Sequence, residues 1–450
     1  MGIPRKVSRR PIAASIVCGL LLAAAALAVA DEPLLAQTQT TAAPQGPPPE
    51  LSPSQAKSNS ISSWFNPSTA PFLPIPLIDT DPYSGTTVGL IPTVLVTNDQ
   101  GEIRRIIAPD VLYNEYFGYG GHGRVFAYPS ANTQWSIEGG AKQHVESEFD
   151  GEYAAGLLRQ DAWSINVSVI YDRSGSGRFF GIGNDSCLCH ESNYTDQQKY
   201  VQLAIGRNLS HTWQIGYVFR PWQVEITPGH IPGIPSIDHT YPNAYESGDR
   251  NQFLNRLYLT YDTRDDLTVP TRGTQWVIYG GIASATGVAN ANLYTETGID
   301  ARHFWKIQRD AVLAGHIALR YMPHTSDLRL LPFWALSSIG GDRAIVGGDQ
   351  PLRGFGAARF RDRDSFSASL EYRKRVWSLN AFATRIELEL APFVDTGRVF
   401  AASRTDPLSH LHWVGGVGVR GIASPFVVGY VDVGYGSEGA AVFTGLAYPF

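Results

Sequence analysis

Hydrophobic and polar side chains alternate along most of the chain from Trp64 to the last residue. In the segment 163–171 the apolar face consists of Trp163, Ile165, Val167, Val169 and Tyr171. The opposite face is mostly polar, with Ile170 as the exception, and residues 213–220 and 313–321 repeat the pattern. A period of two residues predicts β-strands with one apolar face, and aromatic residues near the segment ends are typical of membrane-spanning barrels.

The connections between these segments alternate in length. Long ones at about 173–196, 224–253, 323–364 and 398–411 are interleaved with short ones at about 209–211, 306–309, 378–381 and 422–425. Outer loops and periplasmic turns alternate in this way in outer-membrane barrels. A soluble β-sandwich has alternating strands too, but its strands are shorter and more evenly spaced.

The number of strands follows from counting back from the C-terminus. Five strands follow the longest loop, at about 365–377, 382–397, 412–421, 426–435 and 441–450. A barrel with both ends in the periplasm needs an even number, which selects eleven strands before that loop. The ambiguity lies between Tyr119 and Arg159, where Pro129 interrupts the pattern. We therefore predict an all-β fold, a transmembrane antiparallel β-barrel of about 16 strands.

The N-terminal residues differ from the rest of the chain. Basic residues between positions 5 and 10 precede an apolar run from about 11 to 30, which ends in Ala28-Val29-Ala30. This pattern predicts a signal peptide at 1–30 that is cleaved near Asp31; the alternative is a retained single-span anchor. Residues 31–63 are rich in Thr, Gln, Ala, Pro and Ser and predict a disordered periplasmic tail. The barrel domain is expected at 64–450.

Composition supports one large β structure and excludes one class of partner. The chain has 45 Gly, 21 Tyr, 20 Phe and 10 Trp, with 17% charged residues, which suits aromatic strands joined by tight turns. A formal net charge of -5 leaves no basic surplus for neutralising phosphates, so nucleic acid is not expected to bind. Beyond the signal peptide no apolar run approaches the roughly 18 residues of a membrane-spanning helix. If the chain crosses a membrane, it must therefore do so with β-strands.

A short motif in the longest loop can be matched with carboxylates on the following strands. The motif is Leu352-Arg353-Gly354-Phe355. Alternation places Phe366, Ala368, Leu370 and Tyr372 on one face of the first strand, and hence Glu371 on the lumen face. Ile386, Leu388 and Leu390 face outward on the next strand, so Glu387, Glu389, Phe393 and Asp395 face inward. A guanidinium can bind such carboxylates with bidentate, charge-assisted hydrogen bonds.

These residues resemble the BamA/TamA superfamily of outer-membrane assembly and translocation barrels, also called the bacterial surface antigen family. In that family the longest outer loop folds back into the lumen, and its Arg-Gly-aromatic tip meets acidic residues on the wall. The resemblance implies that Arg353 binds Glu371 and Asp395. Alternatively, all three are solvated charges. Phe393-Val394-Asp395-Thr396-Gly397 matches the family's Phe-x-Asp-x-Gly pattern, which adds Phe393 and Gly397 to the predicted site.

Two further matches lie elsewhere in the chain. Asp262-Thr263-Arg264-Asp265, with Pro270 and Gly273, resembles the family's turn before a mid-barrel strand. At the C-terminus Tyr448 and Phe450 share a face, as in the signal by which the assembly machinery recognises outer-membrane strands. Pro449 departs from that pattern, because proline removes a backbone donor from the last strand. We expect the seam between the first and last strands to be weakly paired.

Two functions are compatible with the resemblance. The leading one is insertion, assembly or translocation of proteins at the outer membrane, with client proteins and a separate periplasmic partner. The second is a passive or gated pore in which the loop motif serves stability alone. The family's assembly members carry soluble periplasmic POTRA modules, and only the predicted tail precedes this barrel, which favours the pore.

The cysteine and histidine residues are the candidates for metal ligands or catalytic groups. Cys187-Leu188-Cys189-His190 offers soft ligands, but there is no second cluster to complete a metal site, so we expect no metal and no cofactor. A local disulfide or two free thiols are the other possibilities. His316 is expected to face the lumen without a matching serine, so we expect no enzyme activity.

Overall fold

The computed structural model describes residues 73–79, 83–98, 103–242, 248–286, 293–322, 347–348, 351–381, 384–401, 406–423, 426–445 and 448. The predicted signal peptide at 1–30, the predicted tail at 31–63 and Phe450 lie outside the described residues.

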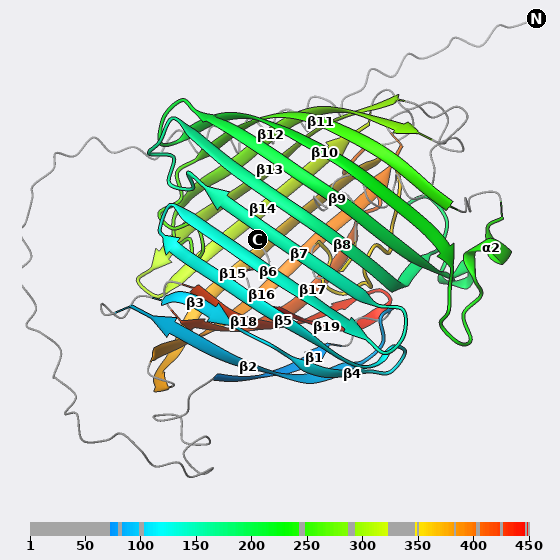
Figure 1. Cartoon of the computed structure of the whole chain (residues 1–450), viewed down its shortest axis with the longest axis horizontal. Helices are drawn as coiled ribbons and strands as arrows, with labels where there is room; N and C mark the ends of the chain where they lie inside the picture. Colours follow the sequence, from blue (N-terminus) through cyan, green and yellow to red (C-terminus); the bar gives the residue numbers. More distant parts are fainter. Residues whose placement is uncertain are drawn as a thin grey trace, which may run out of the picture. The chain divides into compact units, whose positions relative to one another are not determined.

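The described strand segments form one antiparallel sheet, in which strands that follow one another along the chain pair with each other, except β3 and β4 (Figure 1). Their bounds are β1 (Leu73–Asp79), β2 (Thr87–Thr97), β3 (Ile103–Ile107), β4 (Val111–Asn114), β5 (Gly118–Ser130), β6 (Thr133–Lys142), β7 (Ser147–Ala155), β8 (Trp163–Phe179), β9 (Ser192–Asn208), β10 (Trp213–Pro228), β11 (Gly248–Asp262), β12 (Gly273–Thr286), β13 (Leu293–Gln308), β14 (Ala311–Tyr321), β15 (Asp364–Ala381), β16 (Thr384–Phe400), β17 (His412–Ala423), β18 (Phe426–Gly436) and β19 (Gly439–Gly445). Two short helices, η2 (Leu188–His190) and α2 (Ile237–Thr240), lie in loops.

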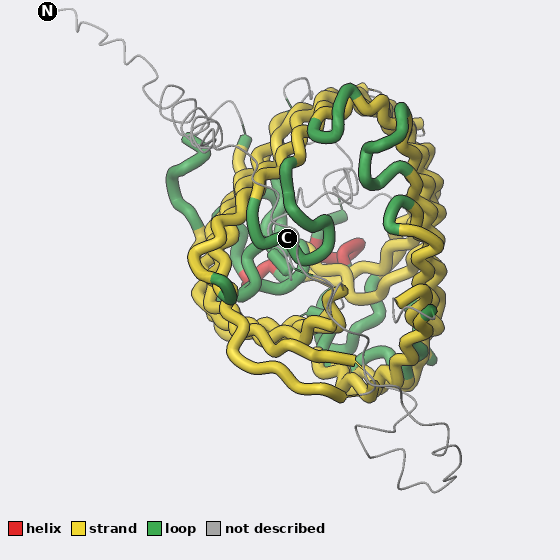
Figure 2. The backbone as a smooth tube through the Cα atoms, turned by 90° about the vertical axis from the view of Figure 1, so that its left-hand side faces the viewer, coloured by secondary structure: helices red, strands yellow, loops and turns green. Residues whose placement is uncertain are grey.

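The sheet closes into a barrel because β1 and β19 lie side by side. Figure 2 shows the strands as a ring with loop segments inside it. The prediction of an all-β antiparallel barrel is therefore confirmed. Within the described residues no helix is long and apolar enough to cross a membrane.

The described part of the chain has more strands than the sixteen expected. The sheet has 19 segments, but β3 and β4 share one position, because both pair with β2 on one side and with β5 on the other. That leaves eighteen positions, still an even number. The five strands after the longest loop lie where they were predicted. The two additional positions precede that loop, where Pro74 and Pro76 obscure β1 and where Pro129 marks a register shift inside β5 instead of a strand boundary.

Side chains separate by face as the alternation predicted. Ile215 and Tyr217 of β10 are exposed, whereas Gln214 and Arg220 are buried in the lumen. Exposed aromatic residues gather near both ends of the strands. At the end with short turns they are Trp163, Tyr217, Trp305 and Trp377; at the end with long loops they are Tyr113, Tyr119, Phe149, Trp413 and Tyr435. Two aromatic belts around an apolar band are the outer surface of a barrel that spans a membrane.

The two ends of the barrel, here called the long-loop end and the short-turn end, differ as expected. The long connections at the long-loop end are 180–191, 229–247, 322–363 and 401–411, whereas those at the short-turn end include 209–212, 309–310, 382–383 and 424–425. The described part of the longest connection begins at Gly347, and residues 351–361 are here called the latch loop.

Candidate functional site

Strands β15 to β18 place charged side chains on the lumen face of the barrel. The buried members include Glu371 of β15, Asp395 of β16, Arg420 of β17 and Asp432 of β18. Leu370 and Val394, which precede Glu371 and Asp395 in the chain, are exposed on the outer face. Alternation along four neighbouring strands therefore gathers these charges in one patch of the wall. Ile386 was also expected to face outward, but it is buried, close to the β15–β16 turn.

Arg353 of the latch loop lies among these side chains and is only 1% exposed. Its Nε and Nη2 each donate to the Asp395 carboxylate, and both hydrogen bonds are 2.9 Å long. Its Nη1 donates to Glu371 at 2.8 Å and to Asp432 at 2.7 Å. The Phe393 ring packs on the guanidinium, with 3.4 Å between Cζ and the ring centroid. A buried guanidinium with bidentate and charge-assisted partners is held more firmly than a surface ion pair.

Glu371 is the centre of a wider charge network. Arg420 donates to both of its carboxylate oxygens, and Arg373 Nε donates to Oε1 at 2.6 Å. Arg420 also lies 3.5 Å from Asp432 and 3.6 Å from Glu389. Three guanidinium groups thus contact four carboxylates inside the barrel. Each charge in such a network depends on its partners, because a buried carboxylate left without one is costly.

The backbone of the latch loop fits closely against glycines of β18. A Cβ on Gly434 would lie 1.9 Å from the Arg353 carbonyl oxygen, and one on Gly354 would lie 2.8 Å from the Gly436 nitrogen. Only residues without side chains allow this approach. Leu352 has a φ of 70° and is fully buried, an uncommon conformation for a leucine that the packing around the tip maintains.

An apolar cluster supports the charged part of the site. Its buried members are Leu352, Phe355, Phe360, Phe393, Val399 and Val414. Phe360 stacks on His412 with 4.0 Å between ring centroids, and Phe355 packs edge-on against Phe360. Gly397, the last residue of the predicted Phe-x-Asp-x-Gly pattern, is buried on β16 and pairs with Ser367 of β15. The latch loop is therefore fixed by both packing and charge.

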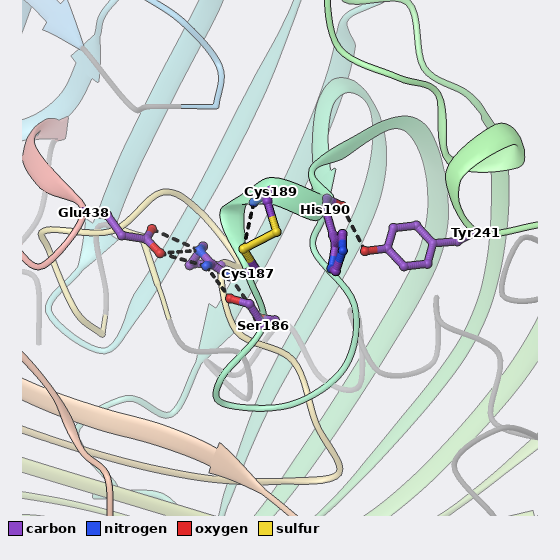
Figure 3. The surroundings of a disulfide bond; sticks show 7 residues. Ser186, Cys187, Cys189, His190, Tyr241 and Glu438 are labelled. Atoms are coloured by element: carbon purple, nitrogen blue, oxygen red, sulfur yellow. Dashed lines mark hydrogen bonds and ion pairs between the residues drawn. A yellow bond between two sulfur atoms is a disulfide. The ribbon is translucent and has the colours of Figure 1, made fainter.

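A second arginine ties the latch loop to the long-loop end. Arg359 Nε donates to both carboxylate oxygens of Glu438, in the β18–β19 turn, at 2.8 and 2.9 Å. Its Nη1 and Nη2 donate to Ser186 Oγ and O at 2.9 and 2.7 Å. Figure 3 shows Ser186 and Glu438 beside the disulfide between Cys187 and Cys189. The two cysteines are thus bonded to each other.

The first hairpin also contacts the latch loop. The Tyr83 ring, in the β1–β2 turn, occupies the space that a Cβ on Gly356 would need, 2.2 Å from it. Arg178 of β8 donates to the Tyr83 carbonyl at 2.6 Å, and Tyr83 packs on Phe180. Because Arg359 binds the last hairpin and Gly356 lies against the first, the latch loop joins both sides of the β1–β19 seam.

The predicted turn residues form a local network at the short-turn end. Asp262 accepts hydrogen bonds from Arg264 Nε and Nη2 at 3.0 and 2.9 Å. Asp265 accepts from the amides of Thr271 and Arg272. Gly273 has a φ of 105°, in the region that favours glycine. Burial raises the pKa of the Asp265 carboxyl, but these hydrogen bonds and the one from the Thr271 hydroxyl outweigh it, so the pKa lies below its ordinary value.

Tyr448 of the predicted C-terminal signal lies against the lumen network. Its hydroxyl donates to Glu389 at 3.2 Å, and Arg373 packs over its ring at 4.1 Å. Tyr448 also packs against Val269 of the turn and Ile422 of β17. The turn thus reaches the C-terminal segment although β11 and β17 are not neighbours in the sheet. Phe450 lies outside the described residues.

Five contributing residues were not predicted from the sequence: Arg373, Arg420, Asp432, Arg359 and Glu438. Alternation could have placed the first three in the lumen, because exposed residues flank them, as Val431 and Val433 flank Asp432. No sequence signal indicated that Arg359 and Glu438 bind each other, because the two residues are 79 positions apart in the chain.

The described residues hold no group of three or more His, Cys, Asp or Glu side chains arranged for a metal ion. His316 is buried in the lumen, as expected, and lies 2.9 Å from Asp300.

A closed antiparallel sheet with an apolar exposed band, a charged lumen and a loop bound inside defines a membrane β-barrel with an internal latch. Comparison with protein families matches residues 131–429 to the Omp85 superfamily domain. The chain belongs to the Omp85 superfamily, and the resemblance drawn from its motifs is confirmed. It is accordingly a protein of the bacterial outer membrane, from the class of barrels that insert proteins into that membrane or translocate them across it.

Solved structures of similar fold include BamA from Haemophilus ducreyi lacking POTRA domains 1-3, with 13% identity and a TM-score of 0.50 over 80% of this chain and 75% of that one. CdiB from Escherichia coli has 11% identity and a TM-score of 0.42, over 83% of this chain and 62% of its own. CdiB from Acinetobacter baumannii has 12% identity and a TM-score of 0.41, over 82% and 58%. At these identities the likeness to BamA shows the fold alone. A search of curated proteins found no match.

Proposed function

We propose that this barrel handles client proteins through lateral opening of the β1–β19 seam, with the latch loop controlling that opening. The observation that carries the proposal is the position of the latch loop. Arg353 anchors it to three carboxylates of the wall, while Arg359 and Gly356 contact the hairpins on either side of the seam.

The β1–β19 seam is the boundary between neighbouring strands that has the least backbone pairing. β1 and β19 each contain seven residues, whereas β15 and β16 contain eighteen and seventeen. Among the described strands, a backbone ladder joins every pair of neighbouring positions in the sheet except β1 and β19. Opening the barrel there breaks the fewest hydrogen bonds and exposes two strand edges. An exposed edge is a template on which an extended client segment can pair.

Several finer parts of the proposal rest on the sequence. We propose cleavage of a signal peptide at 1–30, a periplasmic tail at 31–63 and a barrel domain at 64–450. Client outer-membrane or secreted proteins and a separate periplasmic protein are the proposed partners, together with outer-membrane lipid. We propose no catalytic activity. The lumen histidines His122 and His316 are engaged by carboxylates, which supports a structural role for them.

A disulfide across the seam tests the proposal. Ile78 of β1 is exposed, and Ala440 lies near the same end of β19, so Ile78→Cys with Ala440→Cys provides the lock. Val433→Cys with Val442→Cys is the matched control, because these two residues already face each other within the β18–β19 ladder. Both pairs are made with Cys187→Ser and Cys189→Ser, so that the engineered cysteines are the ones that oxidise.

The assay measures folding of a urea-unfolded eight-stranded outer-membrane barrel into lipid vesicles that contain each variant. We expect the oxidised seam pair to lose the acceleration of folding and to regain it on reduction, while the oxidised control pair stays active. Full activity of the locked barrel would contradict lateral opening. Failure of the unlocked protein to accelerate folding, together with steady ion conductance, would favour the passive pore.

A further inference from the structure

Two prolines in β1 determine which hydrogen bonds that strand can make. Pro74 stands opposite Pro92 of β2, and Pro76 stands opposite Leu90. Proline has no backbone N–H. In an antiparallel ladder, opposite residues either exchange two hydrogen bonds or exchange none. Two prolines cannot exchange any, so Pro74 and Pro92 form a non-hydrogen-bonded pair. The backbone nitrogen and oxygen of Pro74 therefore point away from β2, toward β19.

The next ladder provides an independent check of this orientation. If Pro92 points away from β1, it points toward the position shared by β3 and β4. The β2 ladder there contains Val94 opposite Ile107 and Leu90 opposite Val111, and the same register places Pro109 opposite Pro92. Neither proline can donate at that point, and β3 and β4 are separated by residues 108–110. If Pro92 points toward Pro109, these two residues cannot hydrogen-bond to each other, which accounts for the interruption between β3 and β4.

The two edges of the seam are consequently unequal. Residues two apart in a strand point their backbone groups to the same side, so Pro74, Pro76 and Ile78 all face β19. Of these three only Ile78 has an N–H. The sequence of β19, Gly439–Gly445, contains no proline and keeps every donor. The β1 edge thus offers three carbonyl acceptors but a single donor.

We propose that the open seam captures an extended client strand on the edge of β19 and that β1 is an edge protected against strand addition. This inference rests on the proposed function, since it names the edge that a client uses once the seam has opened. An antiparallel client strand on β1 would lack most of the bonds that donors of β1 would supply, whereas on β19 it could complete the ladder. Proline on an edge strand blocks strand addition for this reason.

Amide hydrogen exchange tests the donor-poor edge without any client. Pro74→Ala combined with Pro76→Ala restores two donors facing the seam, and Pro92→Ala restores one on the other side of β2. We expect the first variant to slow exchange in the segment 439–445 by about fivefold or more, since one hydrogen bond contributes about that factor. Pro92→Ala should leave exchange in that segment unchanged. No slowing in the first variant, or equal slowing in both, would overturn the inference.

Peptide capture tests the choice of edge. The probe is a ten-residue peptide of alternating Thr and Val that ends in a cysteine, added to barrels in lipid vesicles that carry Ile78→Cys or Val442→Cys and the two serine substitutions at the native cysteines. We expect disulfide capture at Val442→Cys to exceed that at Ile78→Cys about fivefold, and Pro74→Ala with Pro76→Ala to raise capture at Ile78→Cys. Equal or greater capture at Ile78→Cys in the parent barrel would overturn the assignment of β19.

The two measurements separate this inference from the proposed function. Capture at neither site would overturn both lateral opening and the role of β19. The exchange result would still decide whether the β1 edge lacks donors.

Discussion

Arg359 of the latch loop and Glu438 of the β18–β19 turn form an ion pair with 2.7 Å between Arg359 Nη2 and Glu438 Oε1. The Tyr83 ring of the first hairpin lies against Gly356 of the same loop. The latch loop therefore spans the seam at the long-loop end, whereas Tyr448 contacts the charge network nearer the short-turn end. These contacts must break before the long-loop end of the seam separates, which is the step that a disulfide between Ile78→Cys and Ala440→Cys would also block.

The coupling between Arg359 and Glu438 can be measured with a double-mutant cycle. The free energies of unfolding of Arg359→Ala, Glu438→Ala and the double variant would be determined by urea titration in detergent. Arg359 is 2% exposed and Glu438 19%, so the pair is only partly screened by solvent. We expect a coupling energy of about 1–2 kcal/mol. Additive effects of the two substitutions would show that the ion pair does not hold the hairpin.

Much of this fold could be predicted from alternation alone. Strand faces, the order of long and short connections and the five last strands follow from the period of two residues. The positions of Glu371 and Asp395 on the lumen face follow from their exposed neighbours Leu370 and Val394. The contact of Arg353 with these carboxylates was predicted from a family resemblance. Periodicity alone does not indicate where a loop folds.

The parts that could not be predicted depend on contacts between distant segments. Asp432 is 79 residues from Arg353, and Tyr83 is still farther from Gly356 along the chain. The strand count failed where local signals conflict, because Pro74 and Pro76 disfavour a strand that the neighbouring β2 nevertheless supports. Their role at the seam emerged only from the register between β1 and β2.

Gly434 tests how closely the latch loop is fitted to β18. Gly434→Ala would place a Cβ 1.9 Å from the Arg353 carbonyl oxygen, so the loop must shift. We expect a loss of about 1–3 kcal/mol in the free energy of unfolding and faster cleavage of the latch loop by protease. Gly415→Ala is the control, since no atom lies within 4 Å of its added Cβ. Equal protease resistance of both variants would contradict the close fit.

Asp265 should make the turn at the short-turn end sensitive to acid. The folded-state pKa of its carboxyl lies below the ordinary value, so its stabilising contribution is present at neutral pH and is lost as the pH falls below about 4. We expect the melting temperature of the parent protein to fall more between pH 6 and pH 3 than that of Asp265→Asn. Thermal melts in detergent at the two pH values provide the measurement. Parallel decreases would exclude Asp265 as a contributor.

We expect Arg353 to be the residue that holds the latch loop inside the lumen. Its removal takes the bidentate partner from Asp395 and one partner each from Glu371 and Asp432, and breaking a buried ion pair typically costs about 3–5 kcal/mol. Arg353→Lys keeps the charge but loses the bidentate geometry, so its effect should be intermediate.

Single-channel conductance in planar lipid bilayers measures the state of the loop most directly. For Arg353→Ala we predict larger and noisier currents than for the parent barrel, because the released loop no longer fills the lumen. Currents that are unchanged in size and noise would contradict the latch.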